Sequence, residues 1–350
     1  MRIRKWIYTT LFLAGFAALM PGFLRSQQGD APRAETAAAF GENADSFDQE
    51  DLPIFVIRSE VSMVSVPVTV RKADGSLLKG LTQKSFKVLE DGKEQEIVFF
   101  AEEALPTHIA IVLDISGSVR PEWGAIKYAT KRFLENFSPD DDFSLTIFND
   151  EIKLIMDWGK TTDPVDAKLS SVYCKDTTKL WDAVWLVSME VFKGLDGKKV
   201  MIIMSDGLDN DSLASYTDAV RAAVENEIAI YIVSTTKALN NYYDYVIPQM
   251  GYNRNDFMYR LQRELVQGEA MLSRLAHATG GRVLQSNDFG QLGNVYAEVS
   301  EELRNQYTVG YISTNTAKDG SYREINVGVR TQDAQNVMIT ARPGYYAPRK

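Results

Sequence analysis

The sequence is poor in two kinds of metal-binding side chain, with one cysteine and two histidines in 350 residues. Most zinc sites, iron–sulfur clusters and disulfide scaffolds need several such side chains, and this composition excludes them. Basic residues are not in excess either, because 38 Lys and Arg stand against 47 Asp and Glu, for a net charge of -9. This charge argues against a nucleic-acid-binding protein, which carries a basic face. Any metal bound here is therefore expected to have oxygen ligands.

The rest of the composition is that of a globular chain. Hydrophobic residues make up 45%, charged residues 24% and aromatic residues 11% of the sequence, which excludes disorder throughout. The length is too great for one ordinary core and suits two domains with additional tails.

The first 26 residues are predicted to be a signal peptide or an uncleaved N-terminal membrane anchor. Basic residues precede an apolar run from Trp6 to Met20, and no Ala-x-Ala cleavage signature follows it. The run is short for a membrane span of about 20 apolar residues, so both interpretations stay open. Residues 27–52 are small and polar and predict a flexible tether. We therefore expect an exported protein that is periplasmic, secreted or held at the membrane.

Strand-like segments occur on both sides of a long middle region. Residues 53–105 contain three such runs and residues 306–350 contain three more. Three strands form a poor sheet alone, so we expect one small discontinuous β-sandwich into which residues 106–305 are inserted. Two unrelated β-appendages are the alternative. The runs are Val61–Val70, Phe86–Leu89, Ile97–Ala101, Tyr307–Ser313, Tyr322–Arg330 and Val337–Ala341. Phe86–Leu89 and Ile97–Ala101 are expected to form a hairpin around a Glu-Asp-Gly-Lys turn.

Strands and helices alternate in the middle region. This order predicts an open, doubly wound α/β domain with a mostly parallel sheet and helices on both faces. Ligands of such sheets bind at the carboxyl ends of the strands. The expected strands are His108–Leu113, Phe143–Asn149, Val200–Ser205, Ile228–Ser234 and Arg282–Gln285, and the expected helices are Glu122–Asn136, Leu180–Phe192, Leu213–Glu225, Glu269–Thr279 and Gln291–Arg304.

Oxygen-bearing side chains gather at those carboxyl ends. Asp114, Ser116 and Ser118 alternate directly after the first strand, so a curved loop can point three oxygens at one spot. Asp206 follows a later strand in the same way, and a threonine segment before a predicted helix supplies a further hydroxyl. Hard divalent cations prefer oxygen ligands, so the pattern predicts a site for Mg²⁺, or for Mn²⁺ or Ca²⁺. Each motif alone could instead cap a helix or a turn.

The Asp-x-Ser-x-Ser loop, the later Thr-x-Leu-Trp-Asp-Ala segment and the Ser-Asp-Gly strand end together resemble a von Willebrand factor type A domain with a complete metal-ion-dependent adhesion site. The β-rich flanks resemble those of exported bacterial members of this superfamily. The resemblance implies that the metal ligands are Asp114, Ser116, Ser118, Thr178 and Asp206. It also implies metal-dependent protein binding at the cell envelope without enzymatic activity, the ion being presented to an Asp or Glu carboxylate of a partner protein.

Two other classes of function stay open. A metal-dependent hydrolase could use further aspartates near the same edge, Asp182, Asp209 and Asp211, but such sites usually also need a positioned base. His108 is expected at a strand start and His277 in a helix, both away from that edge. The other possibility is a structural assembly module with a vacant metal site, which would capture its partner in the presence of a chelator.

The segment 236–264 is far longer than the usual connection of about two to six residues between a strand and a helix. It leaves the carboxyl end of a strand, so we expect it on the metal face. Tyr and Asn are common in it and also at recognition surfaces, so we predict that it shapes the choice of partner. The alternative is a partly helical lid without a binding role. The predicted contact residues are Tyr242, Tyr243, Tyr245, Tyr252 and Arg254.

Overall fold

The computed structural model describes residues 63–349 except 103–104, 136–137, 161, 163–164, 176, 247–248, 250–253 and 331–336, and it describes residues 254–259 by their backbone alone. The predicted signal or anchor and the predicted tether lie outside the described residues. Within the described part of the chain, no helix combines the length and the hydrophobicity needed to cross a membrane. All elements below belong to one compact unit, Ser59–Lys350.

A six-stranded sheet forms the centre of the α/β domain. Its strands are β5 (Thr107–Asp114), β6 (Asp142–Phe148), β7 (Ile152–Gly159), β8 (Lys198–Ser205), β9 (Ile228–Ser234) and β10 (Val283–Gln285). They lie in the order β10-β9-β8-β5-β6-β7, and all neighbours are parallel except β6 and β7. The sequence analysis missed β7. This strand lies at the sheet edge, where all but one of its residues are half-buried or exposed, so it lacks the continuous apolar run of a covered strand.

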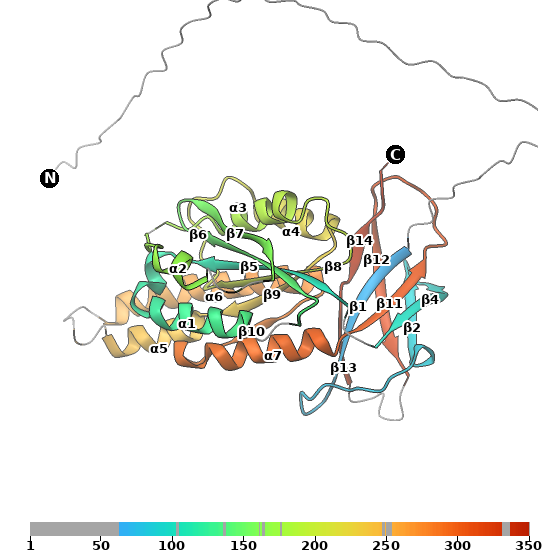
Figure 1. Ribbon diagram of the computed structural model, residues 1–350, viewed down its shortest axis with the longest axis horizontal. Helices are drawn as coiled ribbons and strands as arrows, with labels where there is room; N and C mark the ends of the chain where they lie inside the picture. The colour runs from blue at the N-terminus through green and yellow to red at the C-terminus, as the bar shows by residue number, and fades with distance from the viewer. Residues whose placement is uncertain are drawn as a thin grey trace, which may run out of the picture. The chain divides into compact units, whose positions relative to one another are not determined.

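Helices cover both faces of this sheet (Figure 1). Successive side chains of β5 point to opposite faces, so Ile109, Ile111 and Leu113 join one buried cluster while Ala110 and Val112 join another. The first face is covered by α1 (Trp123–Leu134), α2 (Val165–Ser170), α5 (Thr236–Val246) and α7 (Leu292–Arg304), and the second by α3 (Leu180–Leu186), α4 (Tyr216–Glu225) and α6 (Arg254–Thr279). The predicted doubly wound α/β fold is confirmed.

The two flanks of the chain form one β-sandwich, which lies at one end of this domain (Figure 1). Its strands are β1 (Met63–Lys72), β2 (Phe86–Glu90), β3 (Lys93–Gln95), β4 (Ile97–Ala101), β11 (Tyr307–Ile312), β12 (Tyr322–Val329), β13 (Val337–Ala341) and β14 (Gly344–Tyr346). They form two sheets in the orders β13-β1-β11-β4 and β14-β12-β2-β3, and each sheet contains strands from both flanks. The sandwich is therefore discontinuous, as predicted, and the two flanks are not separate appendages.

The predicted hairpin of Phe86–Leu89 with Ile97–Ala101 is wrong. In the structure β2 pairs with the short strand β3, while β4 pairs with β11 in the other sheet. The chain thus changes sheets at Glu96, between β3 and β4. A strand of three residues is too short to show a period-two pattern in the sequence.

The segment 236–264 is not one long loop. It forms α5 and the first part of α6, which begins at Arg254 and not at the predicted Glu269. Buried leucines of α6, Leu265 and Leu272, are seven residues apart, which places them on one side of the helix. The early start of α6 was missed because the first half of the helix is rich in polar residues, so that its apolar stripe is weak in the sequence.

Candidate functional site

The predicted ligands follow neighbouring strands at the carboxyl edge of the sheet. Asp114 is the last residue of β5, and Asp206 follows β8, which is parallel to β5 with Leu113 paired to Met204. The chain leaves β5 for β6 on one side of it and later returns as β8 on its other side. The point between β5 and β8 is therefore a topological switch point, where open α/β sheets bind ligands.

Hydrogen bonds connect four of the five predicted ligands. One carboxylate oxygen of Asp114 accepts the backbone N–H of Ser116 at 2.8 Å, and the other accepts the hydroxyl of Ser205 at 2.8 Å. The hydroxyls of Ser116 and Ser118 are 3.0 Å apart, and Ser118 donates to Oδ2 of Asp206 at 2.9 Å. The two aspartates are thus linked through the serine loop.

Thr178 is held at the same edge through its backbone. Its N–H donates to Oδ1 of Asn210 at 2.9 Å, and its carbonyl accepts the N–H of Asn210 at 3.1 Å. The next residue, Lys179, donates its N–H to the carbonyl of Asn149 at the end of β6. The Thr178 segment therefore lies between the loops that follow β8 and β6.

The two aspartates are buried without a basic partner in the described part of the chain. Asp114 is 0% and Asp206 1% exposed, and their hydrogen bonds come from hydroxyl and backbone N–H groups. Burial, and after it the charge of Asp206, raises the pKa of Asp114 to about 7, and burial raises the pKa of Asp206 as well. Buried charges in proteins are normally paired or coordinate a metal. This pair lacks a positive charge.

The donor chemistry fits a hard divalent cation. The five predicted ligands offer only carboxylate and hydroxyl oxygens, which Mg²⁺, Mn²⁺ and Ca²⁺ accept. Among the described residues, no group of three or more His, Cys, Asp and Glu side chains is placed to hold a metal. The serine and threonine hydroxyls are therefore needed to complete a donor set around Asp114 and Asp206.

Several residues that fix this geometry were missed by the sequence analysis. Ser205 bonds directly to Asp114, and the hydroxyl of Thr236 at the start of α5 donates to the backbone carbonyl of Asp206 at 3.3 Å. Gly207 turns the chain after Asp206 with φ +82°, and its backbone packs against that of Gly268 in α6. Ser205 and Gly207 adjoin a predicted ligand in the sequence, whereas no local pattern indicates the contact with Gly268.

We expect Gly268→Ala to disturb Asp206. A Cβ at position 268 would lie 2.8 Å from the backbone carbonyl carbon of Gly207 and 2.9 Å from the carbonyl oxygen of Asp206. This overlap should lower the free energy of unfolding by about 1–3 kcal/mol and weaken Mg²⁺ binding, both measurable by thermal unfolding with and without the ion. The control is Gly293→Ala in α7, whose Cβ would meet nothing within 4 Å. Unchanged stability and Mg²⁺ response in Gly268→Ala would contradict the assigned contact.

The other aspartates of this edge have local structural partners. Oδ1 of Asp182 accepts the N–H groups of Leu213 and Ala214, at 2.9 and 2.7 Å. Asp209 accepts the N–H of Leu180, and Asp211 pairs with Lys179 at 3.4 Å. These carboxylates hold the loops around the start of α3.

Neither histidine lies at this edge. His108 is at the start of β5, where its ring bonds to Asp142 at 2.6 Å and to the carbonyl of Asp196 at 3.0 Å. His277 is in the last turn of α6. The positioned base that a hydrolase would need is therefore not supplied by histidine at this site.

The predicted partner-binding residues differ in their placement. Tyr242, Tyr243 and Tyr245 lie on α5, Tyr252 is outside the described residues, and Arg254 begins α6. Tyr243 packs against the buried cluster, and burial together with the charge of Asp206 raises its pKa, which places its ring near the site. Tyr245 is 72% exposed and is available for contact with another molecule.

The protein thus contains a doubly wound α/β domain with a cluster of oxygen donors at its topological switch point. Comparison with known families identifies the class of this domain. The family model for the von Willebrand factor type A domain matches residues 108–298, more than half of the chain. The protein therefore belongs to the von Willebrand factor type A family. Domains of this family typically mediate metal-dependent protein interactions.

Solved structures with a similar fold come from diverse sources. An aerotolerance-related membrane protein from Bacteroides fragilis NCTC 9343 is 14% identical, with a TM-score of 0.41 over 56% of this chain and 98% of that chain. A von Willebrand factor type A protein from Catenulispora acidiphila is 10% identical, with a TM-score of 0.44 over 84% and 75%. Proximal thread matrix protein 1 from the mussel byssus, solved with a zinc-occupied adhesion motif, is 17% identical, with a TM-score of 0.43 over 61% and 49%. No match was found among the curated proteins.

Proposed function

We propose that this protein is a metal-dependent protein-binding module of the cell envelope and not an enzyme. The divalent cation, Mg²⁺ or alternatively Mn²⁺ or Ca²⁺, would be held by Asp114, Ser116, Ser118, Thr178 and Asp206. The observation that carries the proposal is the pair of buried aspartates, Asp114 and Asp206, which are linked through serine hydroxyls. Among the described residues, no basic side chain pairs with either of them.

The same donor set accounts for partner binding. Two carboxylates would neutralise a divalent cation, but they supply only two of the about six or more oxygen ligands that such an ion takes. The remaining ligands are neutral hydroxyls, which leave the ion with coordination to complete. A carboxylate from a partner protein is a charged ligand that can displace water there and gain a strong, charge-assisted interaction. An Asp or Glu side chain is thus the expected anchor of the partner.

The first part of the 236–264 segment supports a surrounding contact surface. Tyr243 is close enough to Asp206 to respond to its charge, and Tyr245 on the same helix is largely exposed. Tyrosine contributes large contact area at recognition surfaces. We assign Tyr245 to the rim of the binding surface and Tyr243 to the support of the metal loop.

Capture of the partner from envelope extract tests this function. We expect the full chain, immobilised, to retain a protein in Mg²⁺ and to release it in a chelator. Tyr245→Ala should weaken the capture by about tenfold, the effect of about 1.4 kcal/mol for a well-packed aromatic contact. Tyr128→Ala, which removes a 69% exposed tyrosine from α1, serves as the matched surface control.

The outcomes separate the alternatives. Capture that is equal in Mg²⁺ and in chelator would contradict the proposal and favour a structural assembly module. Metal-dependent turnover of generic phosphate or ester substrates by the purified chain would instead identify a hydrolase.

A further inference from the structure

The sandwich meets the α/β domain at the end opposite to the metal site. The valines of β1 point into the sandwich core, so the residues between them point outward, to the α/β domain. Part of this contact is closed, because Thr69 and Arg71 of β1 both bond to the buried Glu302 of α7. The other part, along Met63, Ser65 and Pro67, borders a cavity.

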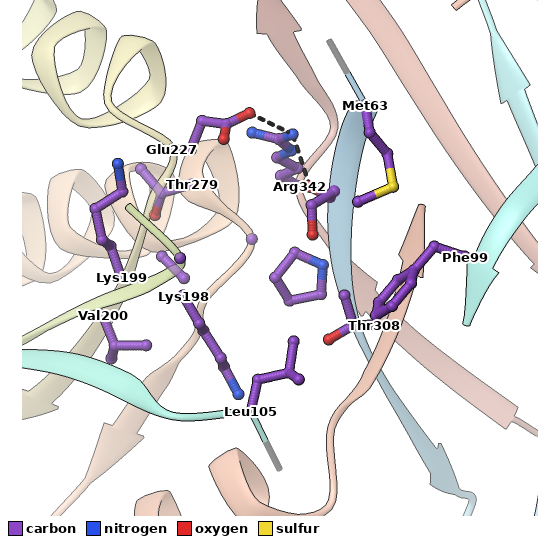
Figure 2. Close-up of a pocket in the computed structure, with 15 residues that line it drawn as sticks. Met63, Phe99, Leu105, Lys198, Lys199, Val200, Glu227, Thr279, Thr308 and Arg342 are labelled. Atoms are coloured by element: carbon purple, nitrogen blue, oxygen red, sulfur yellow. Dashed lines mark hydrogen bonds and ion pairs between the residues drawn. The ribbon is translucent and has the colours of Figure 1, made fainter. Parts of the chain in front are cut away.

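This cavity has a volume of about 280 Å³, close to the lower end of the range for small-molecule sites. Figure 2 shows Met63, Phe99 and Thr308 of the sandwich on one side, and Lys198 of the α/β domain with Leu105 of the connection between β4 and β5 on the other. Lys198 is the first residue of β8, whereas the predicted metal ligands follow the carboxyl ends of the strands. The cavity is therefore a separate site, and nothing in the proposed metal-dependent binding uses it.

Positive charge faces this cavity with little compensation. The ammonium group of Lys198 donates to the carbonyl of Leu303 at 3.0 Å and forms no ion pair with a described residue. Burial lowers the pKa of Lys198 to about 8 although the charges of Asp141 and Glu302 act in the opposite direction. An ammonium group that is withdrawn from water and lacks a close carboxylate gains from an anionic ligand.

Arg342 adds a second cation to the wall. It is 6% exposed and donates from one terminal nitrogen to the carbonyl of Ser65 at 2.7 Å and to Glu227 at 2.9 Å. Its Nε is buried and has no hydrogen-bond partner in the described part of the protein. Glu227 is the one carboxylate among the residues that line the cavity and it pairs with Arg342, whereas Lys198 lines the cavity without an ion pair to a described residue.

The rest of the wall is apolar and partly open. Met63 is 44% and Phe99 36% exposed although both are large apolar side chains. Both pack closely on Gly310 of β11, where a Cβ would lie 2.7 Å from the sulfur of Met63 and 2.9 Å from the Cβ of Phe99. An apolar surface that stays exposed beside a cavity is typical of a binding site.

We propose that this cavity binds a small amphipathic carboxylate, such as a short-chain or medium-chain fatty acid. Its carboxylate would pair with Lys198, and the field of Arg342 would add to the attraction. Its alkyl chain would lie against Met63 and Phe99. A neutral molecule of the same shape would leave the cations unpaired, and a cationic one would be repelled.

Calorimetric titration of the full chain with sodium octanoate tests the site. We expect one molecule to bind per chain with a dissociation constant of about 0.1–1 mM. Sodium hexanoate should bind about 15-fold more weakly, because two methylene groups contribute about 0.8 kcal/mol each. 1-Octanol, which lacks the charge, should bind at least about tenfold more weakly than octanoate, the loss of about 1.4 kcal/mol of ion pairing.

Matched variants locate the binding. Lys198→Met keeps the aliphatic stem and should weaken octanoate binding by about tenfold. Lys199→Met is the control, since this neighbour bonds to the carbonyl of Leu195 and its amino end points away from that of Lys198 (Figure 2). Ser65→Phe places a ring in the cavity and should also reduce binding, which keeps the test valid if one variant folds poorly.

Some results would overturn the site. These are equal binding of octanol and octanoate, unchanged octanoate binding in both Lys198→Met and Ser65→Phe, or no saturable binding up to about 10 mM. The Mg²⁺ response of the protein is measured in parallel. If the protein showed no response to Mg²⁺, this result would contradict the proposed function at the other end of the sheet. It would not contradict the proposed carboxylate site.

Discussion

Glu302→Ala is expected to lower the free energy of unfolding by about 3–5 kcal/mol, the range for breaking a buried ion pair. Glu302 is 0% exposed. One carboxylate oxygen accepts from Arg71 at 2.6 Å and from Arg282 at 2.5 Å, and the other accepts hydroxyls of Thr69 and Tyr231 at 3.2 and 3.1 Å. Alanine would leave two guanidinium groups and two hydroxyls without their shared acceptor.

The same helix offers a matched control. Glu298 lies one turn before Glu302 and contacts the same two arginines, but its side chain is 49% exposed. Glu298→Ala should therefore cost less than about 1 kcal/mol, as expected of an exposed ion pair. Urea denaturation of both variants measures the difference, with the slope of the unfolding curve as a check on the folded state. If the two variants lost equal unfolding free energy, the burial of Glu302 would not be the reason for its contribution to stability.

This network could not be predicted from the sequence. Glu302 lies in a helix with charged neighbours, a pattern that indicates a solvent-exposed face. Its partners come from β1, β9 and the residue before β10, which are far apart in the chain. The sequence shows how often a charge occurs along one helix, but it does not show which distant strand packs on that charge.

Other parts of the fold were accessible because their signals are local. The covered strands β5, β8 and β9 each contain a nearly continuous apolar run, and such runs occur in sheets that are buried on both faces. The edge strand β7 and the short strand β3 lack that signal, and both were missed. The first half of α6 was also missed, because it is polar and lacks a clear apolar pattern.

The candidate site also combines features that have a local sequence signal with features that have none. The order of Asp114, Ser116 and Ser118 after a strand is visible in the sequence, and the structure brings these residues together with Asp206. The supports of Asp206 come from Thr236 and Gly268 in later helices. Packing between distant backbones has no sequence pattern of its own, so these supports required the structure.

Asp114→Asn is expected to remove the stabilisation of the protein by Mg²⁺ without loss of the fold. The wild-type chain should gain about 2.7 kcal/mol of unfolding free energy at a Mg²⁺ concentration 100 times the dissociation constant. The asparagine oxygen can still accept the N–H of Ser116, and its amide can donate to the hydroxyl of Ser205, which accepts as well as donates. Without the ion, the variant should be at least as stable as the wild type, because burial then no longer opposes a charge at this position.

Asp150→Asn provides the comparison for this experiment. Asp150 follows β6 near the same edge and pairs with Lys175 at 3.0 Å, where both side chains are partly exposed. Its loss should change stability by less than about 1 kcal/mol and leave the Mg²⁺ response intact. Thermal unfolding of the three proteins over a Mg²⁺ series measures both effects. If Asp114→Asn and the wild type shift equally with Mg²⁺, the ion binds elsewhere, because a buried ligand that loses its charge cannot hold the same cation with the same affinity.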